Sequence, residues 1–459
     1  MIQAGDNSLK VQISNAQILK IALPISAALI IPNINFITNN IFLGGLGERA
    51  LGNAGTTGVF YLIMMVSGSG LSNAIQVLIS RAAGEGNPKF IGTIFSQGIR
   101  IAILFSIIWM FITWFIAPWC LKSFIKPEDF AMEMDFLNIR IWGLPFLYLF
   151  QTGNAFLIGS LNTRYMMIGT ISEALINIFL DYVFIYGVLG FHQYGFNGAA
   201  IASVISEFSG MCIVFLVIYR QGLLEKFKLL SDLKFDKQAT SSIIKIAFPL
   251  VLQFTISLVT WLVFFILLES YGERAKAISN AMRNVFGVVG VFIWAFASTT
   301  NTMVSNIIGQ GMESRVIPAI KKIMYLSVVS SFIMLCILNI FAQEFLHIFG
   351  QSKAFVSEAI PVLRIISIGM MGMSVGTIWL NAVTGTGKTK MNLLIEFIAI
   401  VLYLTYMYIV MVKYHYSLTV VWTNEFVYWL AIMLISYWFM QSGKWKKNYI
   451  SGLSYVEEN

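Results

Sequence analysis

ALPISAALIIPNINFITNNIFLGGLGERA, residues 22–50, is followed 225 residues later by AFPLVLQFTISLVTWLVFFILLESYGERA, residues 247–275. Each segment has a proline at its third position, then a long apolar run, and each ends in GERA. An apolar run of about 20 residues is long enough to cross a membrane as a helix. The chain therefore repeats a membrane-spanning segment, and this repeat decides how the rest of the sequence is divided.

Two further pairs of segments keep almost the same offset. SRAAGEG (80–86) pairs with SNIIGQG (305–311) at 225 residues, and GSLNTR (159–164) pairs with GTGKTK (385–390) at 226. Chance does not hold one offset across several loops. We interpret the chain as two homologous six-helix bundles of the same orientation. Transporters built from repeats place their substrate site between the halves and rock one half against the other.

The composition is that of a polytopic membrane protein. The 459 residues are 58% hydrophobic and only 11% charged, whereas a soluble domain carries about 25% charged residues. Twelve stretches are long and apolar enough to span a membrane, and they must be helices because backbone groups in hydrocarbon pair internally. The predicted spans are 17–44, 51–80, 94–120, 132–160, 166–190, 196–219, 243–269, 277–308, 318–345, 358–384, 391–411 and 417–440. The predicted fold class is an all-α integral membrane protein with twelve transmembrane helices.

The distribution of basic residues sets the orientation. Lysines and arginines gather in the N-terminal segment, in the even-numbered loops and in the C-terminal tail, which places both termini in the cytoplasm. The net charge of +8 is thus a topology signal, and we expect no nucleic acid partner. We predict an N-terminal bundle at 1–222, a cytoplasmic linker at 223–242, and a C-terminal bundle with its tail at 243–459.

Two other patterns do not support cofactor chemistry. AVTGTGKT (382–389) resembles a phosphate-binding loop, but that motif requires glycine where Ala382 stands and a strand before it. A predicted spanning helix precedes this segment and another follows. Cys120, Cys212 and Cys336 lack the spacing of a metal site or of a disulfide framework. We expect a protein that is not an enzyme and has no organic cofactor.

The fifth predicted helix carries charge inside an apolar run, NIFLDYVFIYG (177–187). Charge at a helix centre costs roughly 2.5–3.5 kcal/mol on insertion scales and marks a candidate functional site. Glu173, Asn177 and Asp181 are four residues apart and form one stripe, because each step of four drifts only about 40° around a helix. A buried carboxyl favours its neutral form, so Asp181 can bind a proton and release it to water, or bind a monovalent cation. The alternative is a structural hydrogen bond to a neighbouring helix.

The other acidic residues within predicted spans are less distinctive. Glu207 and Glu425 occupy corresponding places in the two halves, and for them we favour a structural bond to a neighbouring helix. Glu173 and Glu396 lie nearer the inner ends of their helices, and a functional and an interfacial role both stay open. Glu173 and Glu207 are the additional acidic candidates for a site in the first half.

Several motifs resemble those of the multidrug and toxic compound extrusion (MATE) family. They are ALP opening the first helix, FLGGLG closing it, SRAAGEGNP, GSLNTR, and NIFLDYVFIYG followed by GFNGAAIAS. The resemblance covers nearly the whole chain and implies the MATE/MOP-type fold in the inner (cytoplasmic) membrane of the cell. The NxxxD pattern with GxxGAAIA[ST] is most similar to the prokaryotic DinF-like branch.

The resemblance also implies a cation site in the first half. The family's helix-five Asn and Asp fall on Asn177 and Asp181, and its helix-six Thr falls on Ser203, which keeps the hydroxyl. Its helix-one Asp falls on Asn39, whose amide can ligate a cation but cannot carry a proton. Its helix-one proline falls on Pro24, at a kink whose bending is linked to protonation.

The second half departs from the pattern of another MATE branch. Ser257 and GMSVGT (372–377) stand near the places where that branch has carboxylates in helices seven and ten. At the repeat offset of 225, Phe264 stands opposite Asn39. We therefore expect the ion-coupling polarity in the first half, with Asp181 as its carboxylate.

The expected function is secondary active efflux by alternating access. H⁺ or Na⁺ would be exchanged for an amphipathic, cationic organic compound, with no metal beyond Na⁺ at Asp181 and Asn177. A flippase or exporter of a lipid-linked saccharide is the alternative within the same superfold. A membrane enzyme or a channel is the alternative of another class. The expected partners are the small-molecule substrate and the lipid bilayer, and the chain is expected to be a monomer.

Overall fold

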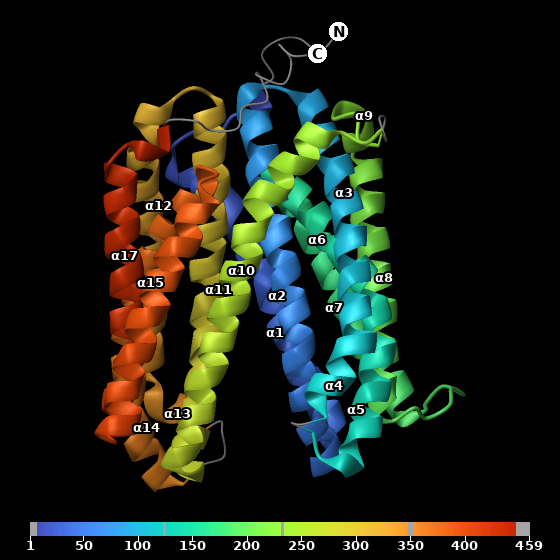
Figure 1. Ribbon diagram of the computed structural model, residues 1–459, viewed down its shortest axis with the longest axis vertical. Helices are drawn as coiled ribbons and strands as arrows, with labels where there is room; N and C mark the ends of the chain where they lie inside the picture. Colours follow the sequence, from blue (N-terminus) through green and yellow to red (C-terminus); the bar gives the residue numbers. More distant parts are fainter. Residues whose placement is uncertain (1–6, 123–124, 231–233, 348–351, 447–459) are drawn as a thin grey trace. The chain divides into compact units, whose positions relative to one another are not determined.

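The computed structural model describes residues 7–122, 125–230, 234–347 and 352–446. Part of the predicted linker (231–233) and the C-terminal tail from residue 447 lie outside the described residues. Within the described part, twelve helical segments are long and apolar enough to cross a membrane, as the sequence predicts. Figure 1 labels these helices along the chain.

Each half contributes six spans. The spans of the first half are α1 (Asn15–Gly44), α2 (Glu48–Glu85), α3 (Pro88–Phe111) continued by α4 (Ala117–Leu121), α5 (Pro127–Arg140) continued by α6 (Leu144–Gly159), α7 (Met166–Tyr186) and α8 (Phe196–Arg220). Those of the second half are α10 (Lys237–Leu267), α11 (Glu273–Gly309), α12 (Val316–Ile340), α14 (Lys353–Gly385), α15 (Thr389–Met407) and α17 (Asn424–Gln441). Short helices α9 (Leu223–Lys226), α13 (Ala342–His347) and α16 (Leu418–Val421) lie in connections.

The predicted helix ends differ from the observed ones mainly where a helix begins in polar sequence. The third span was expected from residue 94, but α3 begins at Pro88. The side chain of Asn87 accepts a hydrogen bond from the Phe90 N–H at 3.0 Å, and proline is favourable at the first helical position. The hydropathy pattern detects only the apolar part of such a helix, so it misses the capped first turn.

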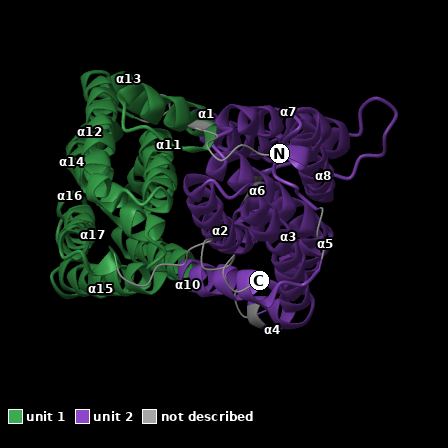
Figure 2. Ribbon diagram, turned by 90° about the horizontal axis from the view of Figure 1, so that it is seen from above, with its two compact units in different colours: residues 1–26, 252–459 green, residues 27–251 purple. Residues whose placement is uncertain are grey.

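The chain groups into two compact units, coloured separately in Figure 2. One comprises residues 27–251, and the other comprises residues 1–26 with 252–459. The boundaries between units fall inside α1 and α10, so each of these helices contributes to both units. The boundaries predicted from the sequence, after residue 222 and before residue 243, remain a prediction.

The backbone carries the repeat that the sequence predicts. Gly86 after α2 and Gly311 after α11 adopt left-handed conformations with φ of 69° and 70°. This region favours glycine because it has no Cβ. Gly47 and Gly272 are the N-caps of the same two helices, with ψ of 170° and 171°. Corresponding loops of the two halves therefore share their backbone conformation as well as their sequence.

The unit of residues 27–251 is held together partly by close packing of α7 on α8. A Cβ added at Gly198 of α8 would lie 2.6 Å from the carbonyl oxygen of Phe184 in α7. It would also lie 2.9 Å from the backbone nitrogen of Ile185. The two backbones thus touch at this glycine, which fixes the spacing of the helices that carry Asn177, Asp181 and Ser203.

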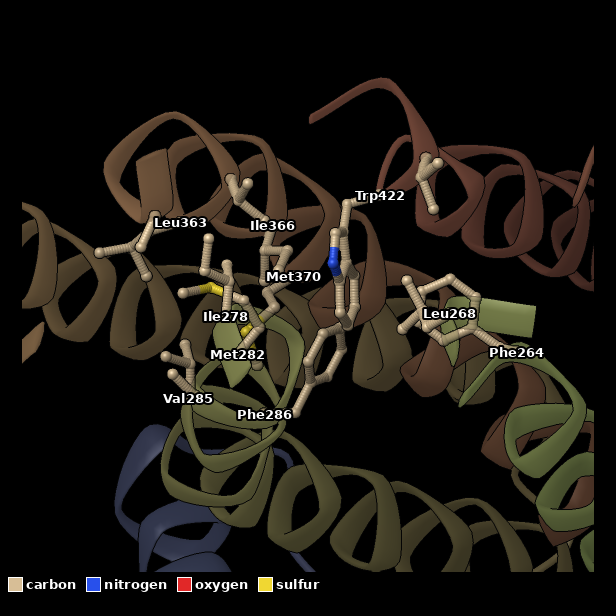
Figure 3. Packing of buried hydrophobic residues seen from close by; sticks show 14 of the residues in the cluster. Phe264, Leu268, Ile278, Met282, Val285, Phe286, Leu363, Ile366, Met370 and Trp422 are labelled. Atoms are coloured by element: carbon tan, nitrogen blue, oxygen red, sulfur yellow. The ribbon is translucent and has the colours of Figure 1, made fainter. Parts of the chain in front are cut away.

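The core of the other unit surrounds a buried tryptophan (Figure 3). The ring of Trp422 is fully buried, with its centroid 4.9 Å from that of Phe264 and 6.1 Å from that of Phe286. Its Nε1–H donates a hydrogen bond to Ser279 Oγ at 3.2 Å. Leu268 and Met282 join the same cluster, which ties α10 and α11 to the segment before α17.

A side-chain clamp fixes the N-terminal segment to α11 in this unit. Asn306 is fully buried; its Oδ1 accepts from the Val11 N–H at 3.0 Å and its Nδ2 donates to the Leu9 carbonyl at 2.9 Å. Gln310 Nε2 donates to the Val11 carbonyl at 3.3 Å. One amide therefore pairs with a backbone N–H and a backbone carbonyl of the N-terminal segment, an arrangement that the sequence pattern did not predict.

The contact at Gly198 gives the first prediction. Gly198→Ala should lower the stability of the purified protein by about 1–3 kcal/mol, because the added methyl meets backbone that cannot move aside. The measurement is thermal unfolding in detergent. Gly55→Ala in α2 is the matched control, since nothing lies within 4 Å of its added Cβ. Equal unfolding temperatures for the two variants would contradict the close approach of α7 and α8.

Candidate functional site

The predicted polar stripe of α7 lies inside the unit of residues 27–251. The helix is apolar over most of its length and ends at Gly187, which takes the left-handed conformation with φ of 70°. Asp181 is fully buried and Asn177 is 2% exposed, so both polar groups are shielded from the surroundings of the bundle. Burial of these two groups means that each needs a partner within the protein or a bound ion.

The amide of Asn177 joins three helices. One of its side-chain atoms lies 2.8 Å from Asn35 Oδ1 and 3.2 Å from Asp181 Oδ2, and because both are acceptors we assign this atom as the nitrogen. The amide oxygen then accepts from the Ser203 backbone N–H and from Ser206 Oγ, both at 3.3 Å. The hydroxyl of Ser203 lies 3.4 Å from the same atom. Asn177 thus connects α1, α7 and α8.

Asp181 is only partly satisfied by these contacts. Its Oδ2 faces the Asn177 amide, whereas its Oδ1 is buried and has no hydrogen-bond partner among the described residues. The ion pairs of the described residues do not include Asp181. A buried carboxyl with one amide donor and one free oxygen can be satisfied by a proton or by a small cation.

The first helix contributes a residue that the sequence analysis did not single out. Asn35 contacts Asn177, whereas Asn39, one turn further along α1, has a buried Oδ1 without a hydrogen-bond partner among the described residues. The signal was present in INFITNN (34–40), where two asparagines four residues apart share one helix face. Asn39 and Asp181 therefore each hold one unsatisfied oxygen in the same unit.

Pro24 lies within α1, which is a single helix from Asn15 to Gly44. It belongs to the unit of residues 1–26 and 252–459, and Asp181 belongs to the other unit. A link between Pro24 and protonation therefore stays a prediction.

Glu207 belongs to a separate buried cluster. Arg140 Nη1 and Nη2 donate to the two carboxylate oxygens of Glu207 at 2.7 Å each, and Tyr61 OH donates to Oε1 at 3.0 Å. The guanidinium also lies 3.7 Å from the centre of the Tyr61 ring. Such a fork-to-fork pair with a stacked ring is a strong arrangement for a buried charge pair. This geometry favours a structural role for Glu207.

The sequence analysis did not connect Arg140 with Glu207. Arg140 ends α5, but α5 and α6 form one span from Pro127 to Gly159, so this end lies within the span. The break between the two helices is a short 3-10 turn, Ile141–Gly143. A Cβ at Gly143 would lie 2.0 Å from Glu207 Oε2, so glycine makes room for the carboxylate.

Glu173 of α7 lies against α8, near the Glu207 cluster. Its side chain packs against Gly210 of α8, where an added Cβ would lie 3.1 Å from Glu173 Cγ. It interacts electrostatically with Arg140 and Glu207. Glu173 thus extends the polar stripe of α7 from Asp181 towards the ion pair.

In the second bundle, apolar side chains occupy the positions that correspond to Asn39 and Asp181. At the repeat offsets of 225 and 226, Asn39 corresponds to Phe264 and Asp181 corresponds to Met407. Both Phe264 and Met407 belong to the buried hydrophobic cluster around Trp422. The two halves share helices and loops, but the positions of Asn39 and Asp181 are apolar in the second half.

The remaining acidic candidates of the second half have partners of their own. Glu425 accepts a hydrogen bond from Trp429 Nε1 at 2.9 Å, within its own helix. Glu396 is 2% exposed and is bonded to side chains of α10 and α17. Among the described residues, no group of three His, Cys, Asp or Glu side chains could hold a metal ion.

The family model described as MatE matches this chain twice, over residues 24–183 and 247–409. The chain belongs to the MATE family. The two matches fall one in each half, so the family model itself recognises the repeat. As a MATE protein with twelve apolar helices, the chain is a multi-pass membrane transporter. Its assignment to the DinF-like branch remains a prediction.

Curated relatives are named as multidrug resistance proteins. The probable multidrug resistance protein NorM of Thermotoga maritima is 24% identical over 96% of this chain and 95% of its own length. The multidrug resistance protein NorM of Aliivibrio fischeri is 20% identical over 77% of each chain.

Solved structures share the fold. A crystal structure of MATE in complex with MaD3S has a TM-score of 0.86 at 17% identity, covering 98% of this chain and 100% of that chain. The outward-facing conformation of a multidrug resistance MATE family transporter of the MOP superfamily has a TM-score of 0.83 at 16% identity. It covers 97% of this chain and 98% of that chain. The twelve-helix MATE/MOP-type fold predicted from the sequence is thus confirmed.

The Arg140 cluster gives the second prediction. Arg140→Met should destabilise this MATE protein by about 3–5 kcal/mol, because it leaves the Glu207 carboxylate buried without its cation. The double variant Arg140→Met with Glu207→Met should regain much of that loss, since it removes both charges. Thermal unfolding of the single and double variants in detergent measures both effects. A double variant as unstable as the single one would contradict the buried pair.

Proposed function

We propose that this MATE protein is a multidrug efflux transporter that exchanges H⁺ or Na⁺ for amphipathic, cationic organic compounds. The names of the NorM relatives support the class of transport, and the polar cluster of the first bundle supports ion coupling. The proposed location is the inner membrane, with both termini in the cytoplasm. The proposed functional unit is a monomer.

The observation that carries ion coupling is the unsatisfied oxygen of Asp181. Asp181 Oδ1 and Asn39 Oδ1 are buried and have no hydrogen-bond partner in the part of the chain that the structure describes. A bound proton neutralises the carboxyl and lets it remain buried, whereas a bound Na⁺ would take carboxylate, amide and hydroxyl oxygens as ligands. The residues that we propose for this ion site are Asp181, Asn177, Asn39 and Ser203, with Asn35 added from the structure.

Exchange then follows from water access to Asp181. Where the site is open to water, the carboxylate is hydrated and can release its ion. Where the site is closed, the bare carboxylate is costly to bury, so closure favours the ion-loaded form. A substrate that binds better to the ion-free form is driven outward as the ion moves inward, because the two ligands are linked through the same conformational equilibrium.

The third prediction tests Asp181 directly. Asp181→Asn should abolish efflux driven by an imposed ion gradient in proteoliposomes, because an amide neither takes up a proton nor offers a charged ligand. The fold should persist, since an amide of the same shape can still bond to Asn177. Asp135→Asn, at an exposed position of α5, is the matched control and should transport normally. Full gradient-driven efflux by Asp181→Asn would overturn the role given to this residue.

The fourth prediction concerns the amide at position 39. Asn39→Asp adds a carboxyl to α1, so transport under a pH gradient should increase relative to wild type. Transport is measured under separate pH and Na⁺ gradients to identify the ion that drives each protein. Identical responses of the variant and of wild type to both gradients would show that Asn39 takes no part in ion coupling.

A further inference from the structure

A buried carboxyl of the second half lies where α10, α15 and α17 meet. Glu396 of α15 is 2% exposed, and its Oε1 accepts hydrogen bonds from Ser257 Oγ and from Tyr428 OH. Its Oε2 accepts from Gln253 Nε2 at 3.3 Å. Gln253 Oε1 in turn accepts from Asn392 Nδ2 at 2.6 Å. These five side chains all belong to the unit that contains residues 252–459.

Within the described part of the chain, no cationic side chain forms an ion pair with this cluster. The ion pairs of the described residues do not include Glu396, unlike Glu207 in the first half. The titratable groups that face it are Tyr428 and, beyond it, Glu425 and Tyr403 of the same bundle. Burial without a counter-charge favours the neutral acid, whereas three neutral donors favour the carboxylate. Burial and hydrogen bonding therefore have opposite effects on the protonation of the Glu396 carboxyl.

The hydrogen-bond network fits both forms of Glu396. The single hydroxyl proton of Ser257 has two acceptors in reach, Glu396 Oε1 and the carbonyl oxygen of Gln253 at 2.9 Å. When Glu396 is ionised, the Ser257 hydroxyl donates to the carboxylate. When Glu396 is protonated at Oε1, its O–H donates to Ser257 Oγ, and the Ser257 proton turns to the Gln253 carbonyl. Both forms are satisfied without movement of heavy atoms.

The amide chain beside the carboxyl ends in a free acceptor. Asn392 is 1% exposed, and its Oδ1 has no hydrogen-bond partner among the described residues. If the Gln253 and Asn392 amides both turn, the Gln253 oxygen faces Glu396 Oε2 and the Gln253 nitrogen donates to Asn392 Oδ1. The network can therefore accept a proton on either carboxyl oxygen.

The repeat does not place a matching cluster around the counterpart of Glu396 in the first bundle. At the offset of 226, Glu396 corresponds to Thr170, whose hydroxyl donates to the Met166 carbonyl of its own helix at 3.2 Å. At the offset of 225, Ser257 corresponds to Pro32, which has no hydroxyl. The carboxyl–hydroxyl pair of Glu396 and Ser257 is thus specific to the second bundle.

We propose that Glu396 is a second proton-binding carboxyl of this transporter, which takes up and releases a proton independently of Asp181. Ser257, Tyr428 and Gln253 stabilise its ionised form, and the proton is exchanged with water. This inference goes beyond the proposed function, which places ion coupling in the first bundle alone. The Glu396 carboxyl joins α10 to α15 and α17 through hydrogen bonds, and the donor and acceptor in these bonds depend on whether the proton is bound.

Infrared difference spectroscopy of the full-length protein in lipid tests the proposal without transport. A carboxylic acid carbonyl band that appears as the pH is lowered should be lost in Glu396→Gln. The same band should persist in Asp181→Asn and in Glu425→Gln, which remove other buried carboxyls. A spectrum of Glu396→Gln that matches wild type at every pH would overturn the proposal. Failure of Glu396 to titrate would leave the Asp181 account, which efflux assays test, unaffected.

A second variant tests the change in the direction of the Ser257 hydrogen bond, which we call the hydroxyl switch, and keeps the Glu396 carboxyl. Ser257→Ala deletes one donor to the ionised form, so the midpoint of the Glu396 band should move by about one pH unit to higher pH. Thr260→Ala is the control on the same helix, because its hydroxyl bonds to the Ile256 carbonyl at 2.8 Å. Equal midpoints for the two variants would show that Ser257 does not stabilise the carboxylate, and would overturn the switch.

Discussion

A carboxyl group that cannot reach water must be neutralised, and this constraint governs the polar interior of the protein. Glu207 is neutralised by a two-pronged bond to Arg140. Glu396 relies on neutral donors alone, and Asp181 has one amide neighbour and a free oxygen. The three groups thus form a series from a fixed ion pair to a carboxyl that needs a ligand. The position of Asp181 in that series, more than its burial, makes it the candidate for ion coupling.

The fold supplies this environment by combining a repeat with local exceptions. Corresponding loops keep the same backbone, as Gly86 and Gly311 show, so the two halves are built on one plan. Side chains at corresponding levels differ, since the counterpart of Asp181 is Met407 in an apolar core. Duplication of helices therefore does not duplicate sites. Asp181 in the first bundle and Glu396 in the second are buried carboxyls without a cation partner among the described residues.

The sequence predicted the twelve spans because length and hydropathy determine which segments can lie in hydrocarbon. It predicted that Asn177 and Asp181 share one face of a helix, because they are four residues apart. The resemblance to the MATE family added Ser203 to the candidate site. It did not predict the contact of Asn35 with Asn177, or the bond of Arg140 to Glu207. The residues of each pair lie on different helices. Whether they come into contact depends on how each helix is rotated and how deep it lies in the bundle, and residue spacing in a single sequence does not reveal this.

In the mechanism that we propose, Asp181 holds the ion that the substrate displaces. The most direct measurement is the release of bound protons or radioactive Na⁺ when tetraphenylphosphonium, a lipophilic cation, is added to the purified protein in detergent. Wild type should release one of these ions on binding the probe. Asp181→Asn should bind the probe without releasing either ion. Equal ion release by the two proteins would contradict the account.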